Sequence, residues 1–475
     1  MTRRAAHSRG RWAAAFVAPL LLLALVGPAG AETMQGALSK AYRNNADLGE
    51  ARAAVRVRDE DVPKAAAGMR PKASVSVNGG PQRTGTRQPN GFDQSHTRIF
   101  AEDQYSGVPK NGTLSVSQTL FDGGKTFNSI DQAESGVFAA RASLRQSEQE
   151  ALHNGATAYM NVLRDTAVLA LRKKNITVLE EQLRVTRDRQ RFGEVTMTDV
   201  AQADAALAQA RSDAVAAAGA LDNSVANYVQ VIGEEPKRLE PARALEALVP
   251  KSRDEAMMAA QAAHPTIVAA LHQVDAAEAA VKVAESALMP TLSVGAQVVQ
   301  QYDSYLGYPG TKQLSGQILG QLNVPLYQGG SEYSGIRQAK EQLGQARIHA
   351  SVQRNAIRAG VAQAYSQLTT AKAAIRYSEI AVKSAEVALR GVRDEAAFGQ
   401  RTTLDVLNAQ QALLDARVKL VTAQRDHVVG SYAVLASIDR LNRDTLALDA
   451  PDYDPAIHFH QIKDNWIGLA TPQGR

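Results

Sequence analysis

The sequence predicts a mainly α-helical chain with a smaller β portion, built as two internal copies of one layout. Three observations predict it: motifs repeated at a constant offset, long windows of helix-forming residues, and four short segments of alternating polarity. The motif QTLFDGGKTFN, with Gly123 and Gly124, returns 206 residues later as VPLYQGGSEYS, with Gly329 and Gly330. Length alone would suggest about three domains, but the duplication indicates one elongated body of two fused copies.

Upstream of these motifs the offset between the copies changes. Pro71 in MRPKASV matches Pro290 in LMPTLSV 219 residues later, which is 13 more than the offset downstream. The extra residues must therefore lie between Pro71 and Gly123, and we expect them in a surface loop, because loops tolerate insertions.

The predicted division of the chain follows from these offsets. It comprises a signal peptide (1–31), a first copy (32–232) with a β-hairpin at about 72–120, a linker (233–251), a second copy (252–440) with a β-hairpin at about 291–325, and a C-terminal tail (441–475).

The N-terminus has the pattern of a secretory signal peptide. Four arginines precede an apolar run at about 13–26, and Ala29-Gly30-Ala31 supplies small residues for cleavage. The run is shorter than the roughly 20 apolar residues of a membrane-spanning helix, so we expect the mature chain to begin at Glu32. Removing the arginines lowers the formal charge from +5 to +1, and nothing then indicates a nucleic-acid partner. The absence of cysteine excludes disulfides and a lipid-modified N-terminal cysteine.

Two long helical windows are expected, one in each copy. Gly124 to Gly193 and Gly330 to Gly399 are each 69 residues apart, with few glycines or prolines between them. At about 1.5 Å per residue each window would span roughly 100 Å. Apolar residues recur every seven positions, as at Leu169, Ile176 and Leu183. This spacing predicts supercoiled helix pairs held together by apolar seams.

Each copy interrupts the helices with two segments of alternating polarity. Period-two segments of about ten residues are typical of strands with one apolar face. The apolar positions are Val75 and Val77, then Leu114 and Val116, and in the second copy Leu292, Val294, Ala296 and Val298, then Leu314, Ile318, Leu322 and Val324. The aromatic residues around them are Phe92, Phe100, Tyr105, Phe121, Tyr302, Tyr305, Tyr308 and Tyr327. Strands with aromatic flanks match the wall of a transmembrane barrel, although a soluble sheet is the alternative.

The number of strands constrains the number of chains. Four strands cannot close a barrel, for which about eight is the minimum. Two chains would give eight strands and a filled bore, whereas three would give twelve strands and an open bore. Only the open bore could pass a solute through the barrel, so we expect a homotrimer.

The order of the motifs resembles one known family. Strand, Leu-Phe-Asp-Gly-Gly or Pro-Leu-Tyr-Gln-Gly-Gly, long helix, Phe-Gly, then Thr-Asp-Val or Leu-Asp-Val and a second helix occur in both copies. Over about residues 33–440 the chain resembles the TolC-like outer-membrane efflux proteins. The resemblance implies a trimeric outer-membrane β-barrel, four strands per chain, continuous with a long coiled-coil α-helical periplasmic tunnel. The missing N-terminal cysteine resembles the non-lipidated branch, and the FDGG spelling favours members that serve type I secretion.

The resemblance also implies a function and partners. The chain would be a channel-tunnel for export across the periplasm and the outer membrane, in type I secretion, multidrug efflux or both. Its partners would be an inner-membrane transporter, a periplasmic adaptor protein, two further copies of itself and outer-membrane lipid. The Gly-Gly pairs would turn the chain from strand into helix.

By the same resemblance, the two Phe-Gly turns form a gate at the periplasmic end of the tunnel. Arg401 is expected to link its helix to Thr198 and Asp199 and so hold the inner helix pair closed. Asp405 is expected to project into the bore, where a trimer would carry a ring of three carboxylates. The alternative is an ordinary surface ion pair and a solvated acid.

Two departures from the family pattern bear on this gate. The tyrosine latch position falls on Ala396, and the second acidic position of the selectivity ring falls on Asn408. We therefore expect a weaker closed state and cation capture by Asp405 alone.

The sequence gives little support for nucleotide binding, metal binding or catalysis. GGKT at Gly123–Thr126 resembles a phosphate-binding loop, but that motif requires a glycine at the position of Thr119, and the second copy lacks the lysine. His458 and His460 form the one close histidine pair, in a tail that we expect to be solvated rather than metal-binding. No motif of a hydrolase or zinc enzyme occurs. We expect no enzymatic activity and no cofactor.

The rival interpretation is a periplasmic coiled-coil adaptor or structural protein without a barrel. It would explain the seven-residue spacing but not the four amphipathic strand segments. The exported cargo leaves no signature, because a tunnel that passes many substrates has no side-chain pocket to recognise.

Overall fold

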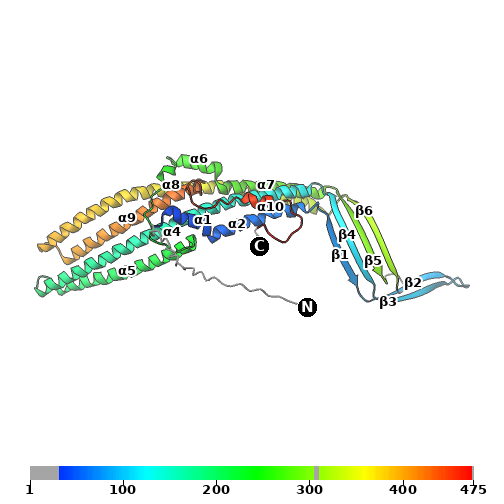
Figure 1. Ribbon diagram of the computed structural model, residues 1–475, viewed down its shortest axis with the longest axis horizontal. Coiled ribbons are helices and arrows are strands. Elements are labelled where there is room, and N and C mark those ends of the chain that lie inside the picture. Colours follow the sequence, from blue (N-terminus) through cyan, green and yellow to red (C-terminus); the bar gives the residue numbers. More distant parts are fainter. Residues whose placement is uncertain (1–30, 304–309, 473–475) are drawn as a thin grey trace, which may run out of the picture.

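The computed structural model describes residues 31–303 and 310–472 (Figure 1). The predicted signal peptide up to residue 30, together with Tyr305 and Tyr308, lies outside the described residues. The chain is an elongated rod of helices with a β-sheet at one end and the tips of two helical hairpins at the other. It is mainly helical, as predicted.

Two long helical hairpins form the rod. In the first half the helices are α1 (Met34–Asn44), α2 (Ala46–Asp59), α3 (Asp61–Ala66), α4 (Lys125–Arg191) and α5 (Met197–Ile232). In the second half they are α6 (Arg253–Ala263), α7 (Pro265–Glu285), α8 (Ser331–Ala397), α9 (Thr403–Ser437) and α10 (Pro455–Ile462), with short 3-10 turns η1 (Glu246–Leu248) and η2 (Ser286–Leu288). Both α4 and α8 have 67 residues, and each pairs with the helix that follows it. Every helix among the described residues is too short or too polar to cross a membrane.

The main hydrophobic core lies in the middle of the rod. There α1 and α2 pack on α4, and residues near the ends of α5 and α9 join the same core. Leu38, Leu152, Tyr159, Tyr228 and Leu435 are fully buried in it. A second cluster lies toward the hairpin tips and includes Ile176 and Leu183 of the seven-residue series, as expected for a supercoiled seam.

Four strands form one antiparallel sheet in the order β1-β4-β5-β6. They are β1 (Lys72–Gly79), β4 (Lys110–Phe121), β5 (Thr291–Tyr302) and β6 (Lys312–Asn323). Residues directly opposite each other share a face of the sheet. Two rows on one face read Val75–Leu114–Val298–Gly316 and Ala73–Val116–Ala296–Ile318, whereas two rows on the other read Ser74–Ser115–Gln297–Gln317 and Ser76–Thr113–Val299–Ser315. The sheet thus has one apolar face, largely exposed in the single chain, and one mainly polar face.

The register of the sheet repeats between the two halves. Val75 pairs with Leu114 in the first half. Adding the offset of 219 to the first residue and 206 to the second gives Val294 and Gly320, which pair in the second half. The two offsets read from the sequence therefore correspond to one conserved hairpin geometry.

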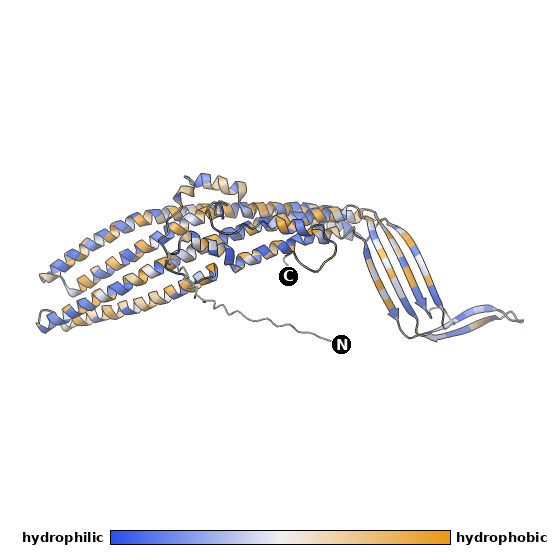
Figure 2. Cartoon of the chain, viewed as in Figure 1, coloured by the Kyte–Doolittle hydropathy of each residue, from blue (hydrophilic) through white to orange (hydrophobic). Residues whose placement is uncertain are grey.

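The inserted residues form more than the predicted surface loop. The segment between β1 and β4, which holds the 13 extra residues, contains β2 (Gln82–Phe92) and β3 (Arg98–Gly107), a separate two-stranded sheet that extends beyond β1 and β4 (Figure 1). Figure 2 shows this hairpin as mainly hydrophilic, so it lacks the apolar alternation that marks the other strands. Pro89 lies at its irregularity in register, where a proline is tolerated in a strand.

The linker is held against the middle of the rod. Glu32 forms a parallel bridge with Leu239, and the Tyr159 hydroxyl lies 2.7 Å from the carbonyl oxygens of both Glu32 and Glu240. A hydroxyl has one proton, so Tyr159 shares it between the two carbonyls. One buried side chain of α4 thus fastens the first described residues and the linker together.

The C-terminal tail is not solvated as expected. It returns along the outside of α2, where α10 places His458 against Asp59, with Nδ1 2.9 Å from Oδ2. Asp59 is fully buried and His458 nearly so. Burial of a carboxylate requires a hydrogen-bonding partner, and the histidine ring supplies it from 399 residues away.

Replacing His264 by asparagine should reduce the acid sensitivity of the fold. His264 is 3% exposed and caps α7, where its Nδ1 accepts a hydrogen bond from the Thr266 N–H at 3.2 Å. Burial lowers the pKa of His264 to about 4. Because the unfolded chain has a pKa of about 6.5, the contribution is full above that pH and is lost as pH falls toward 4, by up to about 3 kcal/mol.

The measurement compares unfolding of the wild type and His264→Asn from neutral pH down to about pH 4. Asparagine is a strong helix N-cap but does not titrate. The unfolding midpoint of the variant should fall less steeply with pH. Parallel curves for the two proteins would contradict the assignment.

Candidate functional site

Paired glycines lie at both passages from strand into long helix. Gly123 and Gly124 separate β4 from α4, with φ of +69° and +84°, and Gly329 and Gly330 precede α8 with φ of +69° and +83°. Side chains disfavour these left-handed values. At Gly123 a Cβ would also lie 2.4 Å from the Cβ of Met289. The Asp122 carboxylate accepts from the Thr126 N–H at 2.9 Å, so the turn is occupied by its own side chains.

The tips of the two helical hairpins have the same local geometry. α4 ends before Gly193 and α8 before Gly399, with φ of +78° and +77°. The next helices begin with capping boxes, in which Thr196 pairs with Asp199 and Thr402 pairs with Asp405. A capping box satisfies backbone N–H groups at the helix start. Each of these threonine and aspartate pairs therefore has a structural role as a helix cap, independent of any role in a channel.

Each tip has an ion pair, but the positive and negative residues stand at different positions in the two copies. In the first tip Arg189 Nε donates to Glu194 Oε2 at 3.0 Å, and in the second Arg401 Nε donates to Glu395 Oε2 at 2.7 Å. Glu395 lies 206 residues after Arg189, so the equivalent position carries opposite charges in the two copies. Within one chain Arg401 is thus brought together with Glu395, and not with Thr198 or Asp199, where the gate hypothesis placed it.

Both predicted carboxylates are held ionised. Hydrogen bonds from the Thr196 hydroxyl and N–H lower the pKa of Asp199, with a smaller effect from Thr403. Hydrogen bonds from the Thr402 N–H and hydroxyl, and the nearby Arg401 charge, lower the pKa of Asp405. Both groups therefore carry a negative charge at neutral pH.

The remaining predicted gate residues differ in exposure. Thr198 and Asn408 are exposed, whereas Ala396 is buried inside its hairpin. A side chain larger than alanine at position 396 would have to displace its neighbours.

Large apolar side chains are exposed at both tips. Phe192 is 82% exposed and Phe398 is 83% exposed. Met197 and Leu404 on the following helices are also exposed. Equivalent, uncovered apolar groups at the same end of the rod indicate a surface for contact with other protein.

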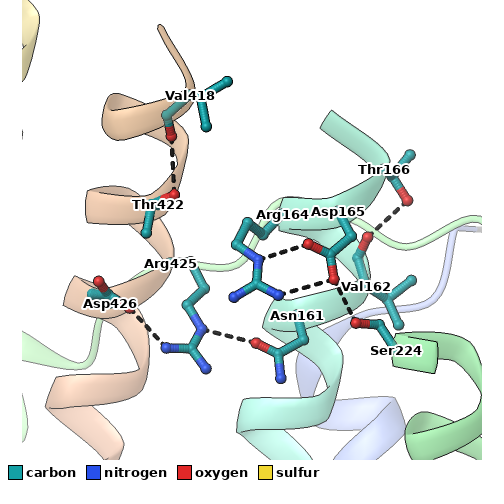
Figure 3. A network of polar contacts seen from close by, with 10 residues as sticks. All are labelled: Asn161, Val162, Arg164, Asp165, Thr166, Ser224, Val418, Thr422, Arg425 and Asp426. Carbon is teal, nitrogen blue, oxygen red and sulfur yellow. Dashed lines mark hydrogen bonds and ion pairs between the residues drawn. The ribbon is translucent and has the colours of Figure 1, made fainter. Parts of the chain in front are cut away.

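A polar network that the sequence did not reveal crosses the rod between the core and the tips (Figure 3). On α4 the Arg164 guanidinium donates two hydrogen bonds to the carboxylate of Asp165, at 2.8 and 2.9 Å. The Ser224 hydroxyl of α5 donates to the same carboxylate at 2.5 Å. On α9 Arg425 donates to Asn161 of α4 at 2.9 Å and to its neighbour Asp426 at 2.7 Å. Polar side chains thus join α4 to both α5 and α9.

The second hairpin replaces this polar contact by small residues. Ala371 and Gly430 lie 206 residues after Asp165 and Ser224. A Cβ at Gly430 would lie 3.3 Å from the Cα of Leu368, so α8 and α9 approach closely there. These two small residues line a half-open groove of about 800 Å³ between α8 and α9, together with His153, Arg425 and Asp426.

No metal site accompanies these groups. Over residues 31–303 and 310–472, no three side chains of His, Cys, Asp or Glu lie close enough together to hold a metal ion. The described histidine and carboxylate contacts are helix caps, ion pairs and buried hydrogen bonds.

The sequence matches known proteins over most of its length. The family model for outer membrane efflux proteins matches residues 37–234 and 257–436. The chain is 40% identical over 446 residues to the outer membrane efflux protein BepC of Brucella suis, covering 94% of this chain and 93% of that protein. It is 25% identical over 361 residues to the outer membrane protein TolC of Escherichia coli, covering 72% and 73% of the two chains.

Solved structures share the fold. A membrane protein from Pseudomonas aeruginosa superimposes with a TM-score of 0.71 at 18% identity, over 86% of this chain and 91% of that one. The outer membrane protein VceC of Vibrio cholerae gives a TM-score of 0.67 at 19% identity, over 86% of this chain and 96% of that one.

Replacing Asp165 by alanine should destabilise the rod by about 2 kcal/mol, because Arg164 and Ser224 would lose a charged hydrogen-bonding partner in a mostly buried place. The Asp165 side chain is 9% exposed and that of Arg164 is 28% exposed. Asp426→Ala is the control, since the side chain of Asp426 is 44% exposed and its pair with Arg425 should contribute less than about 1 kcal/mol. Denaturant unfolding of both variants measures the difference; equal losses would contradict a structural role for the Asp165 network.

Proposed function

The chain belongs to the outer membrane efflux protein family, and on that premise we propose that three copies of it form one export duct through the outer membrane and across the periplasm. Members of this family are outer-membrane efflux channels, which are not enzymes, and the chain is an outer-membrane protein with a periplasmic tunnel part. The observation that carries the proposal is the four-stranded sheet, with its apolar face and its two unpaired edges.

The direction of the strands supports closure between copies. Each strand of the order β1-β4-β5-β6 is antiparallel to its neighbour, so β6 runs opposite to β1. Pairing β6 of one copy with β1 of the next continues the alternation. In a bilayer every strand edge must be paired, because no water is present to satisfy it. Three copies give twelve strands and an open bore.

The internal repeat supplies a register for this contact. The pairing of β4 with β5 joins the first copy of the layout to the second, and β6 and β1 are the equivalents of β4 and β5. Val116 pairs with Ala296 within the chain. Leu322 lies 206 residues after Val116, and Val77 lies 219 residues before Ala296, so Leu322 should pair with Val77 of the next copy. Both residues lie on the apolar face, as closure requires.

The two faces of the sheet fit a membrane wall. Apolar side chains would face lipid, and the serine, threonine and glutamine rows would face a wet bore. A periplasmic adaptor without a barrel has no need for such a sheet, so this observation favours the channel over that rival.

The helical part would continue the bore through the periplasm. The exposed Phe192 and Phe398 at the hairpin tips support a docking role toward a periplasmic adaptor and, through it, an inner-membrane transporter. Some relatives are named for secretion, such as the alkaline protease secretion protein AprF of Pseudomonas aeruginosa, and BepC is named for efflux. We propose export with such partners as the general role, in type I secretion, multidrug efflux or both.

We propose that the contacts of the gate form between neighbouring copies of the chain. Within one chain Arg401 pairs with Glu395, and both side chains are about half exposed. Such a pair contributes little stability, so Arg401 can exchange Glu395 for Thr198 or Asp199 of a neighbouring copy when the tips close. Asp405 would supply the charge of the selectivity ring, and Asn408 would supply only a neutral amide.

A cysteine pair across the proposed contact should link three chains. The pairing of Ser117 with Gly295 predicts that Asn323 lies opposite Ser76 of the next copy, by the same offsets. The chain has no native cysteine, so Ser76→Cys with Asn323→Cys should give an oxidised ladder of monomer, dimer and trimer in denaturing electrophoresis of outer membranes.

Two matched pairs control this test. Ser74→Cys with Ser115→Cys lies within one chain, with hydroxyls 2.8 Å apart, and should oxidise without a ladder. Ser76→Cys with Gln317→Cys is six residues out of register, or roughly 20 Å, and should stay unlinked. A ladder that ends at two chains, or none with the predicted pair, would refute the trimer as proposed.

Removing the charge of Asp405 should lower the cation selectivity of the channel in planar bilayers. Asparagine keeps an acceptor for the capping box that Asp405 forms with Thr402, so Asp405→Asn tests the charge and not the cap. Asp199→Asn changes the equivalent cap of the first hairpin and should alter selectivity less. If the two variants shift the reversal potential equally, Asp405 is not the ring residue.

A further inference from the structure

The tail beyond α10 reaches the point where the chain enters the sheet. Arg70 precedes β1 by two residues, and its guanidinium lies 4.9 Å from the centre of the Trp466 ring. The same guanidinium donates to the carbonyl oxygen of Asn465 at 2.8 Å. These two contacts hold the tail at the boundary between helices and strands, where Figure 1 shows the loop after α10 next to the start of β1.

The tail exposes large apolar side chains at this place. Trp466 is 64% exposed, Ile467 is 97% exposed and Leu469 is 103% exposed relative to the reference state. Three such side chains within four residues are unusual for a surface that only water covers. Arg70 holds the backbone at Asn465 and lies over the ring of Trp466, while Ile467 and Leu469 remain uncovered.

The residues that hold this segment are tied to a row on the apolar face of the sheet. Gln118 belongs to an apolar-face row, since it pairs with Val294. Its side-chain amide donates at 3.3 Å to the carbonyl oxygen of Met69, the residue before Arg70. The residues just before β1, which hold the tail through Arg70, are therefore themselves held by a side chain of an apolar-face row.

Other exposed apolar and aromatic residues mark the same level of the molecule. Phe121 at the end of β4 is 47% exposed, and beyond β6 Leu326 is 90% and Tyr327 is 75% exposed. Aromatic residues at the ends of membrane strands lie at the height of the lipid headgroups. Trp466 would complete such a girdle with an indole, which favours the interface more than the other side chains.

We propose that the segment Trp466–Leu469 inserts into the periplasmic leaflet of the outer membrane and acts as a shallow lipid anchor beside the barrel. The proposal rests on the barrel of the proposed function, which sets the height of the bilayer. The segment binds phospholipid. Its apolar side chains enter the upper part of the acyl chains, and the positively charged side chains of Arg70 and Lys463 contact the phosphate groups. The anchor fixes the tail, and through α10 the outside of α2, to the membrane surface.

Tryptophan fluorescence tests the proposal directly. The sequence has two tryptophans, Trp12 and Trp466, and only Trp466 follows the predicted signal peptide. The mature trimer is reconstituted into vesicles of phosphatidylethanolamine and phosphatidylglycerol, with or without phosphatidylcholine brominated near the top of its acyl chain. Trp466 should emit at short wavelength, lose most of its emission to the bromolipid, and resist quenching by aqueous acrylamide.

Variants separate insertion from mere proximity. Ile467→Asp with Leu469→Asp should shift the emission of Trp466 to longer wavelength and remove most of the quenching by bromolipid. Met258→Asp is the control, because Met258 is 67% exposed on α6, away from the sheet. That control should behave as the wild type.

The outcomes distinguish this proposal from the channel itself. Flotation of the protein with vesicles and its migration as a trimer report on the proposed function, and failure there is failure of the barrel. If the trimer floats but Trp466 is quenched by acrylamide and not by bromolipid, the anchor is wrong and the barrel stands. Short-wavelength emission without quenching by bromolipid would mean that protein covers the segment, which also overturns the anchor.

Discussion

Backbone hydrogen bonding is the constraint on which the rest of this molecule depends. In the sheet β4 and β5 are paired on both sides, whereas β1 and β6 each offer one open edge. A bilayer does not tolerate an open edge, and the chain carries in its own duplication the template for closing it. The pairing of β4 with β5 within the chain and the proposed pairing of β6 with β1 of the next copy are equivalent in geometry. The strand-to-helix glycines and the equal lengths of α4 and α8 then follow from one unit used repeatedly.

The two halves keep a common backbone and differ in the side chains that hold it. Asp165 and Ser224 form a hydrogen bond in the first hairpin, whereas the equivalent positions of the second are Ala371 and Gly430, and Gly430 lies close to Leu368. A hydrogen bond to a charged group fixes the orientation of two helices relative to each other, because the bond is directional. Small residues instead let the two helices pack closely together. The halves are therefore equivalent in shape but not in surface chemistry, and a partner would meet two alternating kinds of hairpin.

Local and periodic features could be predicted from the sequence, whereas contacts between distant side chains could not. The helices and the four strands follow from apolar periodicity and the repeated motifs, and the two offsets relate the observed pairing of Val75 with Leu114 to that of Val294 with Gly320. The β2–β3 hairpin was missed because its strands lack apolar alternation. The burial of His458 against Asp59 spans 399 residues, and no local pattern marks either partner. The pair of Arg401 with Glu395, six residues earlier, was also not predicted, and the proposed link of Arg401 to Thr198 and Asp199 stays a prediction.

The β2–β3 hairpin has a consequence for how such a chain can change over generations. It makes its own ladder, and a described tie to the rest is the Tyr105 hydroxyl, which donates to the carbonyl of Asp303 at the end of β5. Its length and charge can drift without moving any pairing in the wall, because the inserted residues lie wholly between two fixed registers. In the proposed barrel, with the helices on the periplasmic side, this hairpin would lie on the outer side of the membrane. In that arrangement, substitutions in the hairpin would change the outer surface of the channel without changing the strand pairing of its wall.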